Sequence, residues 1–415
     1  MTVTLPLRSP RRASAARAAG APSRPAAALW RRLDWVLLAA VTALLAIGAL
    51  LVWSATVHRV DLTGGDSTAF LRKQVVNAGI GAALAAVVAA TDHRWLRLWA
   101  PVLYGLSVLG LALIFVPGVG ATLNGSHSWL LVGGLSLQPA ELAKFGVVLG
   151  MAFVLAERAE AHLRHGVNAV DVVPALLIAV VPAVLILAQP DLGTLMVLSA
   201  TVFGVVGLSG APRRWLFGLA VAGAVVVVAA VQSGLLASYQ LLRFAAFTDP
   251  SLDPRGAGYN TQQARIAIGN GGITGQGLFE GTQTQAGFVP EQYTDFVFTV
   301  AGEELGLVGA AAVVALFALL LWRALRIARD ADDLFGRVAA AGIACWFGFQ
   351  TFQNIGMCLG IMPVTGVPLP LVSYGGTSMF ASLMAVGLLL NIHLRTAGRS
   401  GHGVVVRSRV ARSRF

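Results

Sequence analysis

The first candidate for chemistry is an acid–base pair inside an apolar segment, in the run Gln138-Pro139-Ala140-Glu141-Leu142-Ala143-Lys144. Pro139 suits the first turn of a helix. Glu141 and Lys144 are three positions apart, so a helix places them on one face, where they can pair. Ionisable groups in an apolar span are costly and face a cavity or one another. Two interpretations stay open: a structural ion pair, or a lysine that holds an anionic headgroup.

The second candidate is Asp295, where a long loop becomes a helix. It lies in the run Phe288-Val289-Pro290-Glu291-Gln292-Tyr293-Thr294-Asp295-Phe296. Aspartate is favoured as an N-cap, and this interpretation stays open. An aspartate beside aromatic residues at an interface can instead have a pKa raised by desolvation, which suits a general base.

Three further segments are rich in polar or helix-breaking residues. Asp191, in the tight turn Gln189-Pro190-Asp191-Leu192-Gly193-Thr194, is interpreted as the cap of the following helix. Glu303 and Glu304, between Gly302 and Gly306, are interpreted as a structural network. Prolines and glycines break the helix at 363–378, and broken backbone at membrane depth must line protein or a water-filled cavity.

The elements that position these residues are apolar spans. Of the 415 residues, 56% are hydrophobic and 12% charged, against about 25% charged in a soluble domain. A membrane-spanning helix needs about 20 apolar residues. The candidate spans number ten: roughly 34–54, 74–91, 98–117, 138–156, 169–188, 192–209, 215–233, 295–322, 338–360 and 368–393. The sequence therefore predicts an all-α integral membrane protein.

The basic residues predict the orientation of these spans. With ten spans, 23 of the 30 Lys and Arg residues fall on the side that holds both termini, and 6 fall on the other side. The last one, Lys144, lies inside a predicted span. Both termini are thus expected in the cytoplasm. The net charge of +11 faces anionic membrane lipids and does not indicate a nucleic-acid partner.

The chain is expected to have three parts. Residues 1–33 form a disordered basic cytoplasmic arm, 34–393 form the polytopic membrane domain, and 394–415 form a basic cytoplasmic tail, also expected to be disordered. One large extracytoplasmic loop, about 234–294, joins the seventh and eighth spans. Its apolar stretches predict short helices on the membrane surface. Cys345 and Cys358 form neither a disulfide framework nor a metal motif.

Together these segments resemble the SEDS family (shape, elongation, division, sporulation) from about residue 34 to 393. QPAELAK is similar to the family's QPSE-x-x-K, QPDLGT matches as it stands, and PEQYTDF is similar to PE-x-H-TDF. GEELG and PLPLVSYGGTS also match. The run Gly281-Thr282-Gln283-Thr284-Gln285 and the Pro-Val-Thr-Gly at 363–366 are more similar to RodA, the elongation member, than to FtsW, the division member.

The resemblance implies a multi-pass protein of the bacterial plasma membrane that polymerises lipid II into glycan strands. It gives Asp295 the place of the proposed catalytic aspartate and Lys144 that of a functionally important lysine. Around them, the candidate substrate-binding residues are Gln138, Glu141, Trp129, Arg243 and Arg265. In this reaction Asp295 would take a proton from a sugar 4-hydroxyl, while the cations hold the pyrophosphate of the polyprenyl-linked strand.

The chain departs from the family pattern at three positions. Tyr293 replaces the usual His, and Ser128 and Ser136 stand where many relatives have Arg. The outer loop that contains both serines therefore has no Lys or Arg. Its His127 is a weaker candidate for contacting the pyrophosphate than Lys144, Arg243 or Arg265.

The resemblance also implies cofactors and partners. A divalent cation, Mg²⁺ or Mn²⁺, is the alternative to Arg243 at the pyrophosphate, and no other cofactor is expected. The expected protein partner is a class B penicillin-binding protein, a transpeptidase. Two other functions stay open: a flippase that moves lipid II outward, and a scaffold that recruits an enzyme. The flippase would suit the broken helices, but no inverted repeat is visible and the polar motifs cluster at the outer face.

Overall fold

The structure, a computed structural model, describes residues 32–412 apart from 124–125, 133–134, 162–166, 234–237 and 255. Two compact units divide the chain, Met1–Leu33 and Asp34–Phe415. The predicted N-terminal arm therefore lies almost wholly outside the described residues. Two of the basic residues counted for the orientation, Arg164 and Arg255, also lie outside them.

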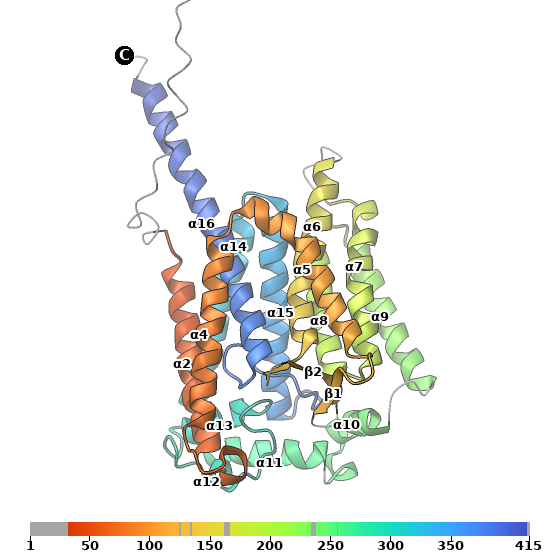
Figure 1. Cartoon of the computed structure of the whole chain (residues 1–415), viewed down its shortest axis with the longest axis vertical. Helices are drawn as coiled ribbons and strands as arrows, with labels where there is room; N and C mark the ends of the chain where they lie inside the picture. Colours follow the sequence, from red (N-terminus) through yellow and green to blue (C-terminus); the bar gives the residue numbers. More distant parts are fainter. Residues whose placement is uncertain are drawn as a thin grey trace, which may run out of the picture. The chain divides into compact units, whose positions relative to one another are not determined.

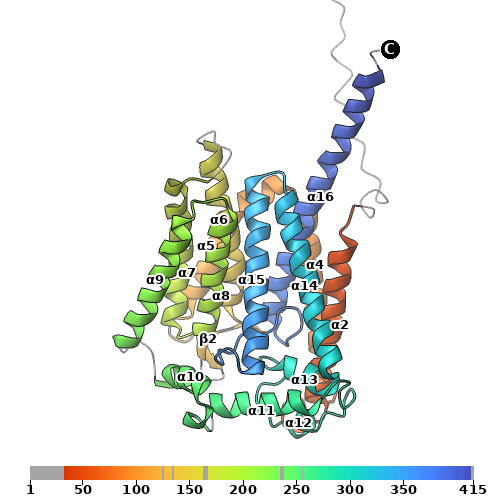
Figure 2. The same ribbon diagram turned by 180° about the vertical axis from the view of Figure 1, so that it is seen from behind.

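Long apolar helices make up most of the second unit. Eight helices of the described chain are long and apolar enough to cross a membrane: α2 (Trp35–Val57), α4 (Ala69–Ala90), α5 (His93–Leu113), α6 (Pro139–Ala161), α7 (Ala169–Ala188), α9 (Arg214–Gln232), α14 (Gly306–Asp330) and α16 (Gly376–Arg412). The shorter α8 (Leu192–Leu208) and the more polar α15 (Leu334–Leu359) run alongside them (Figures 1 and 2). The helical membrane fold is confirmed, and the count of ten spans stays a prediction.

Helices α6 and α15 form the centre of this bundle. α6 packs against α5, α7, α15 and α16, while α15 packs against α8 and α14. Most of their side chains are buried. None of the residues of α9 is buried, which is the pattern of an apolar helix surrounded by lipid. Polar groups on α6 and α15 are consequently enclosed by protein.

Short helices gather at one end of the bundle, as the loop composition predicted. Between α9 and α14 lie α10 (Ser238–Thr248), η1 (Pro250–Leu252), α11 (Ala257–Asn270), α12 (Thr282–Ala286) and α13 (Val297–Glu304). Figure 1 shows them at the end of the bundle opposite to the C-terminal end of α16. The short α3 (Val60–Thr63) follows α2 at this same end.

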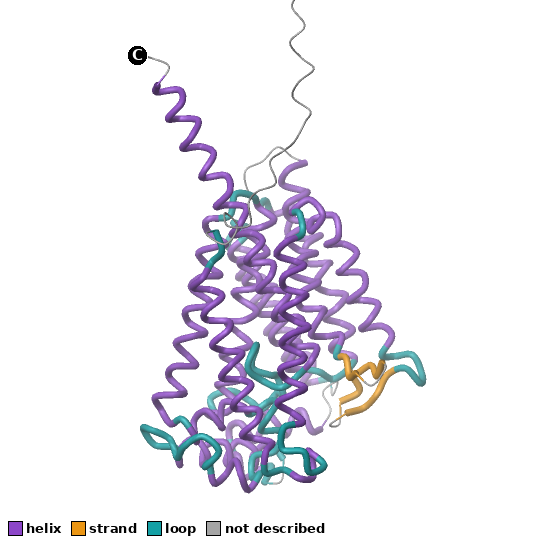
Figure 3. The backbone as a smooth tube through the Cα atoms, turned by 60° about the vertical axis from the view of Figure 1, so that its left-hand side comes forward, coloured by secondary structure: helices purple, strands orange, loops and turns teal. Residues whose placement is uncertain are grey.

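A small antiparallel sheet is the one departure from an all-α fold among the described residues. Its strands are β1 (Gly120–Leu123), β2 (Ser126–Val132) and β3 (Leu135–Leu137), in the order β1-β2-β3. Figure 3 shows them beside the helix ends. The three short strands pair their backbone groups with one another, so a segment too short for another span satisfies its hydrogen bonds without a helix. β3 leads directly into Gln138 and α6.

The eighth predicted span, 295–322, is wrong as a single helix. It is divided into α13 and α14 at Gly306, whose φ is +65°. A Cβ at Gly306 would lie 2.2 Å from the backbone N of Gly275. The loop around Gly275 packs against this break, and the N–H of Leu307 donates to the carbonyl of Gly272 over 2.9 Å. The span that follows therefore begins at Gly306, and Asp295 precedes it.

Two further boundaries differ from the prediction. The tenth helix begins at Gly376 instead of 368, and residues 363–375, here called the 363–375 segment, contain no helix, as their prolines and glycines predicted. At the other end, α16 continues to Arg412 through most of the expected disordered tail. Helix formation there extends a span that is already nucleated, which removes the cost of starting a new helix.

Candidate active site

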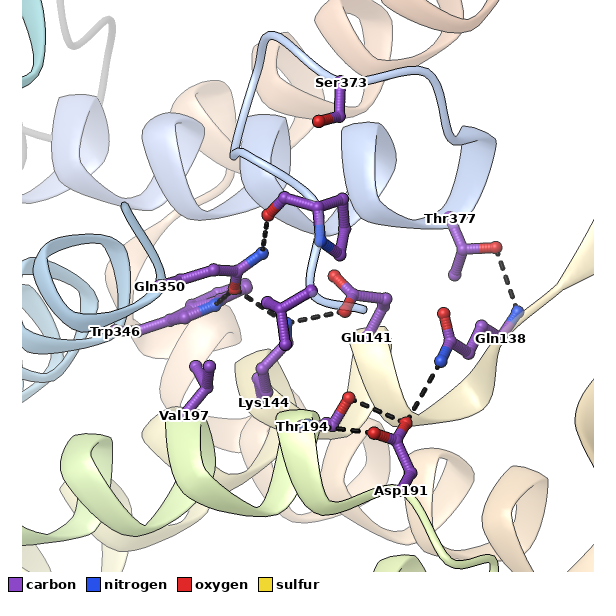
Figure 4. Close-up of polar contacts among 12 residues, drawn as sticks. Gln138, Glu141, Lys144, Asp191, Thr194, Val197, Trp346, Gln350, Ser373 and Thr377 are labelled. Atoms are coloured by element: carbon purple, nitrogen blue, oxygen red, sulfur yellow. Dashed lines mark hydrogen bonds and ion pairs between the residues drawn. The ribbon is translucent and has the colours of Figure 1, made fainter. Parts of the chain in front are cut away.

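Lys144 lies fully buried in the centre of the bundle, with an exposed fraction of 0%. Its Nζ donates to Oε1 of Glu141 over 2.7 Å and to Oε1 of Gln350 over 2.8 Å (Figure 4). It also lies 5.3 Å from the ring centroid of Trp346, within reach of a cation–π interaction. The predicted Glu141–Lys144 pair is confirmed. The lysine is held by protein groups and does not reach the surface of the site.

The segments that contain Gln138 and Asp191 meet where α6 and α8 begin. Gln138 donates from Nε2 to Oδ2 of Asp191 over 3.2 Å, and its backbone N–H donates to Oγ1 of Thr377 over 3.1 Å. Asp191 accepts from the N–H of Thr194 over 2.9 Å, so its interpretation as a helix cap is confirmed. Figure 4 shows Gln138 between Asp191 and Thr377. This contact joins the beginnings of α6, α8 and α16.

Asp295 belongs to a tight turn that precedes α13. The carbonyl of Glu291 accepts from the N–H groups of Thr294, Asp295 and Phe296. α13 begins at Val297 after Phe296, and no side chain caps it. The N-cap interpretation of Asp295 is therefore wrong. Its carboxylate is left available for another role.

The turn containing Asp295 packs on the 363–375 segment. The N–H of Tyr374 donates to the carbonyl of Tyr293 over 3.0 Å, and the Ser373 hydroxyl donates to the carbonyl of Thr294. From α15, Nδ2 of Asn354 donates to the carbonyl of Asp295 over 2.7 Å. The broken segment thus forms the surface on which the aspartate sits.

The Asp295 side chain is half-buried, and its carboxyl lies in a mostly desolvated and acidic environment. Burial raises its pKa to about 7, and the nearby carboxylates of Glu291, Asp191 and Glu141 contribute in the same direction, while Arg243 opposes them. A group with such a pKa is about half ionised at neutral pH, which is the range in which a general base works best.

Arg243 is the cation that the structure brings near Asp295. It lies half-buried on α10, and Gln240 on the same helix donates to the carbonyl of Pro190 over 3.1 Å. That bond ties α10 to the turn that holds Asp191. Arg265 instead lies exposed on α11, with its Cδ 3.2 Å from a Cβ built at Gly360. Within the described residues, Arg265 makes no hydrogen bond or ion pair to the other candidates.

The remaining sequence candidates have structural partners. Trp129 lies half-buried on β2, where it pairs with Ala121 of β1. His127 is within hydrogen-bond distance of the Ile114 carbonyl, 3.1 Å, and of the Thr122 hydroxyl, 3.0 Å. Neither residue shows a contact with Asp295.

The GEELG acids form the structural network that was predicted. Glu303 is fully buried and accepts from the N–H groups of Gln283 and Thr284 over 2.7 and 2.9 Å, and from the Thr284 hydroxyl. Glu304 accepts from the hydroxyl of Ser54 on α2. These bonds hold the GTQTQ run against α13.

The residues that sequence reasoning missed are neutral and lie mainly on α15. Gln350 and Asn354 contact Lys144 and the Asp295 backbone, and Trp346 covers the lysine. Their signal in the sequence was a cluster of amides in the ninth apolar span. Nothing in that span alone says which residues the amides contact.

The chain matches a known family over most of its length. The family model of FtsW, RodA and SpoVE, described as a cell cycle protein, matches residues 34–398. The chain belongs to this family. Among curated relatives, the peptidoglycan glycosyltransferase MrdB of Escherichia coli K12 is 38% identical over 363 residues, 87% of this chain and 93% of that protein. A probable peptidoglycan glycosyltransferase FtsW of Trichlorobacter lovleyi is 36% identical over 359 residues, 86% and 92%.

Solved structures of the family have the same fold. A chain of a peptidoglycan synthase complex has a TM-score of 0.72 at 36% identity, covering 88% of this chain and 98% of that chain. Thermus thermophilus RodA has a TM-score of 0.62 at 33% identity, covering 88% and 97%. Because elongation and division relatives are nearly equally similar, the expected place in the RodA subgroup stays a prediction. A multi-pass location in the bacterial plasma membrane is confirmed.

No three His, Cys, Asp or Glu side chains of the described chain come together in a way that could hold a metal ion. The acidic groups near Asp295 therefore do not form a protein cage for Mg²⁺ or Mn²⁺, whose binding normally needs several oxygen ligands in fixed geometry. No step of the reaction is assigned to a metal.

Proposed function

We propose that this protein is a peptidoglycan glycosyltransferase that polymerises lipid II, with Asp295 as the general base. The observation that carries the proposal is the Asp295 carboxyl itself. It caps no helix, is largely desolvated, has a pKa of about 7 and lies near the guanidinium of Arg243. The relatives named peptidoglycan glycosyltransferase supply the substrate class.

The chemistry follows from these groups. The Asp295 carboxylate takes the proton of the 4-hydroxyl of one lipid-linked disaccharide, and the hydroxyl oxygen attacks the anomeric carbon of the growing strand. The bond from that carbon to the pyrophosphate breaks, and the polyprenyl pyrophosphate leaves. A single displacement on an α-linked donor gives a β-linked product. The leaving group is already activated, so the protein has only to accept a proton and stabilise negative charge.

Arg243 is the proposed contact of the pyrophosphate. Lys144 supports the site without contacting the substrate. Its buried ammonium pairs with Glu141 and binds Gln350, which in turn donates to the 363–375 segment. Trp129, Gln138 and Arg265 have no established role in the reaction.

Polymer formation by the purified protein tests the proposal. Wild-type protein given lipid II should produce glycan strands on a gel, and Asp295→Asn should produce none while inserting normally. Asp249→Asn is the matched control, because this aspartate is exposed in the same outer loop. Strands from Asp295→Asn at the wild-type rate would remove Asp295 from catalysis. Headgroup translocation in sealed vesicles without polymer would support the flippase instead.

The metal requirement has a separate test. Because the described residues form no metal cage, we propose that any Mg²⁺ or Mn²⁺ binds through the pyrophosphate of the substrate. A chelator should then slow polymerisation, whereas Mg²⁺ should leave the melting temperature of the substrate-free protein unchanged. A Mg²⁺-dependent rise in that temperature would indicate a site made by the protein alone.

A crosslinking transpeptidase is the proposed partner. One solved relative belongs to a complex that coordinates polymerization and crosslinking. A class B penicillin-binding protein is the expected kind, and co-purification from membranes that contain both proteins would test it.

We propose that the protein acts in elongation and not in division. The GTQTQ and Pro-Val-Thr-Gly runs, which are more similar to RodA than to FtsW, support this assignment. Rescue of a strain lacking its elongation polymerase, but not of one lacking its division polymerase, would support this assignment.

A further inference from the structure

A row of three amide side chains lines one face of α15. Gln350, Gln353 and Asn354 are spaced i, i+3 and i+4, so a helix places them together. All three have an exposed fraction of 0%. Burying an amide is costly unless it forms hydrogen bonds. The partners of these amides therefore indicate why polar residues are present in the centre of the bundle.

Each amide donates to the 363–375 segment. The bonds run from Gln350 to the Pro368 carbonyl over 2.8 Å, from Gln353 to the Thr365 hydroxyl over 2.6 Å, and from Asn354 to the Val367 carbonyl over 2.8 Å. Since this segment has no helix of its own, side chains of α15 supply the donors that a regular backbone would provide. The row thus holds the 363–375 segment against α15.

The members of the row differ in their second contact. Nδ2 of Asn354 also donates to the Asp295 carbonyl over 2.7 Å, whereas Gln350 accepts from Lys144. Gln353 contacts neither charged residue. The Oδ1 atom of Asn354 is buried and has no hydrogen-bond partner among the described residues, an arrangement that lowers stability. The hydrogen bonds of the Asn354 side chain among the described residues are therefore both donated by its nitrogen.

We propose that Asn354 is a positioning residue for the reaction. One nitrogen bridges the backbones of Asp295 and Val367, and so holds the carboxylate beside the residue that precedes Val367, Gly366. The inference rests on the proposed function, because it assigns Asn354 the task of aiming the general base.

Removing this bridge should misplace the base without unfolding the protein. The turn keeps its bonds from Tyr374 and Ser373, so it stays near the segment. A displacement of about 1 Å at a reacting group can lower a rate about a hundredfold. A loosened turn also admits water, which lowers the pKa of Asp295. The charged groups that act on that carboxyl, Glu291, Arg243, Asp191 and Glu141, are unchanged in this variant.

The test compares two positions of the same row in purified full-length protein. Asn354→Leu removes the bridge to Asp295, and Gln353→Met is the matched control, because it also removes a buried amide with an unpaired oxygen. With lipid II as substrate, Asn354→Leu should lower kcat about a hundredfold with KM little changed, and should move the acid limb of the pH profile to lower pH. Gln353→Met should keep the wild-type profile and most of kcat.

Equal losses of kcat in the two variants, or an unchanged pH profile in Asn354→Leu, would overturn the proposal. If Asn354→Leu does not fold, Asn354→Asp and Gln353→Glu replace the pair, since a protonated carboxyl of the same shape can donate one bond. The Asp variant should then have an intermediate kcat, and a wild-type kcat overturns the role. Wild-type and Asp295→Asn proteins in the same assay separate the two ideas. An active wild type with an inactive Asp295→Asn supports the proposed function, and an Asn354→Leu protein with wild-type kcat then refutes the positioning role alone.

Discussion

Gly366 lies against the carboxylate of Asp295. A Cβ built at residue 366 would stand 3.2 Å from Oδ2 of Asp295, and the φ of Gly366 is +70°. The backbone conformation and the lack of a side chain are therefore both required where the 363–375 segment passes the base. Gly366 therefore both allows the turn of the backbone and leaves room for the carboxylate.

Gly366→Ala should lower activity. The alanine costs about 1–2 kcal/mol in the left-handed region. It also displaces the carboxylate by a few tenths of an ångström, which lowers kcat by less than the loss of about a hundredfold that a shift of about 1 Å causes. Gly272→Ala is the control, because its φ is +55° and nothing lies within 4 Å of the added Cβ. A gel assay and a melting temperature for each variant check this. Equal activities of the two alanine variants would contradict the contact with Asp295.

The pH profile of polymerisation should have an acid limb near the Asp295 pKa of about 7. The base must be ionised, so kcat/KM rises with pH through this value. Glu291→Gln removes a negative charge that raises the pKa and should move the limb to lower pH. Arg243→Gln removes an opposing positive charge and should move it to higher pH. Shifts in the same direction would show that Asp295 is not the titrating group.

Asp295→Asn should be inactive yet more heat-stable than wild type at alkaline pH. The folded-state pKa of about 7 lies above the unfolded value of about 3.9. The protonated carboxyl therefore favours folding at acid pH, and this contribution is lost as pH rises through about 7. Asparagine stays neutral and avoids the loss. Melting temperatures in detergent at pH 5 and pH 8 measure it, and a variant less stable at both values would argue against desolvation.

Lys144→Met should destabilise the protein by about 3–5 kcal/mol, because it leaves the Glu141 carboxylate buried without its partner. The double variant Glu141→Gln, Lys144→Met removes both charges and should recover most of that stability. Unfolding and polymerisation are measured on both. If the double variant regains stability without activity, the lysine's charge assists the reaction. If it regains both, the pair is structural only.

The polar motifs predicted most of the candidate site. Asp295, Lys144 and Glu141 were candidates by residue type and position, Arg243 was added by the family resemblance, and the structure groups their charges. The cap role considered for Asp295 was wrong, since the helix begins at Val297. Arg265 was included only because it is a cation on the outer side, and charge alone does not say which way a helix faces.

The sequence by itself determined the helical membrane class and the ends of the bundle at which the motifs lie. Apolar length and the placement of arginine are local properties, and each span must satisfy its own backbone in lipid. Only the tertiary structure decided that Gln350 meets Lys144 across 206 positions and that Asn354 meets Asp295 across 59. Such pairs depend on which helices pack together. The apolar surfaces of the spans resemble one another too closely for composition to specify that packing.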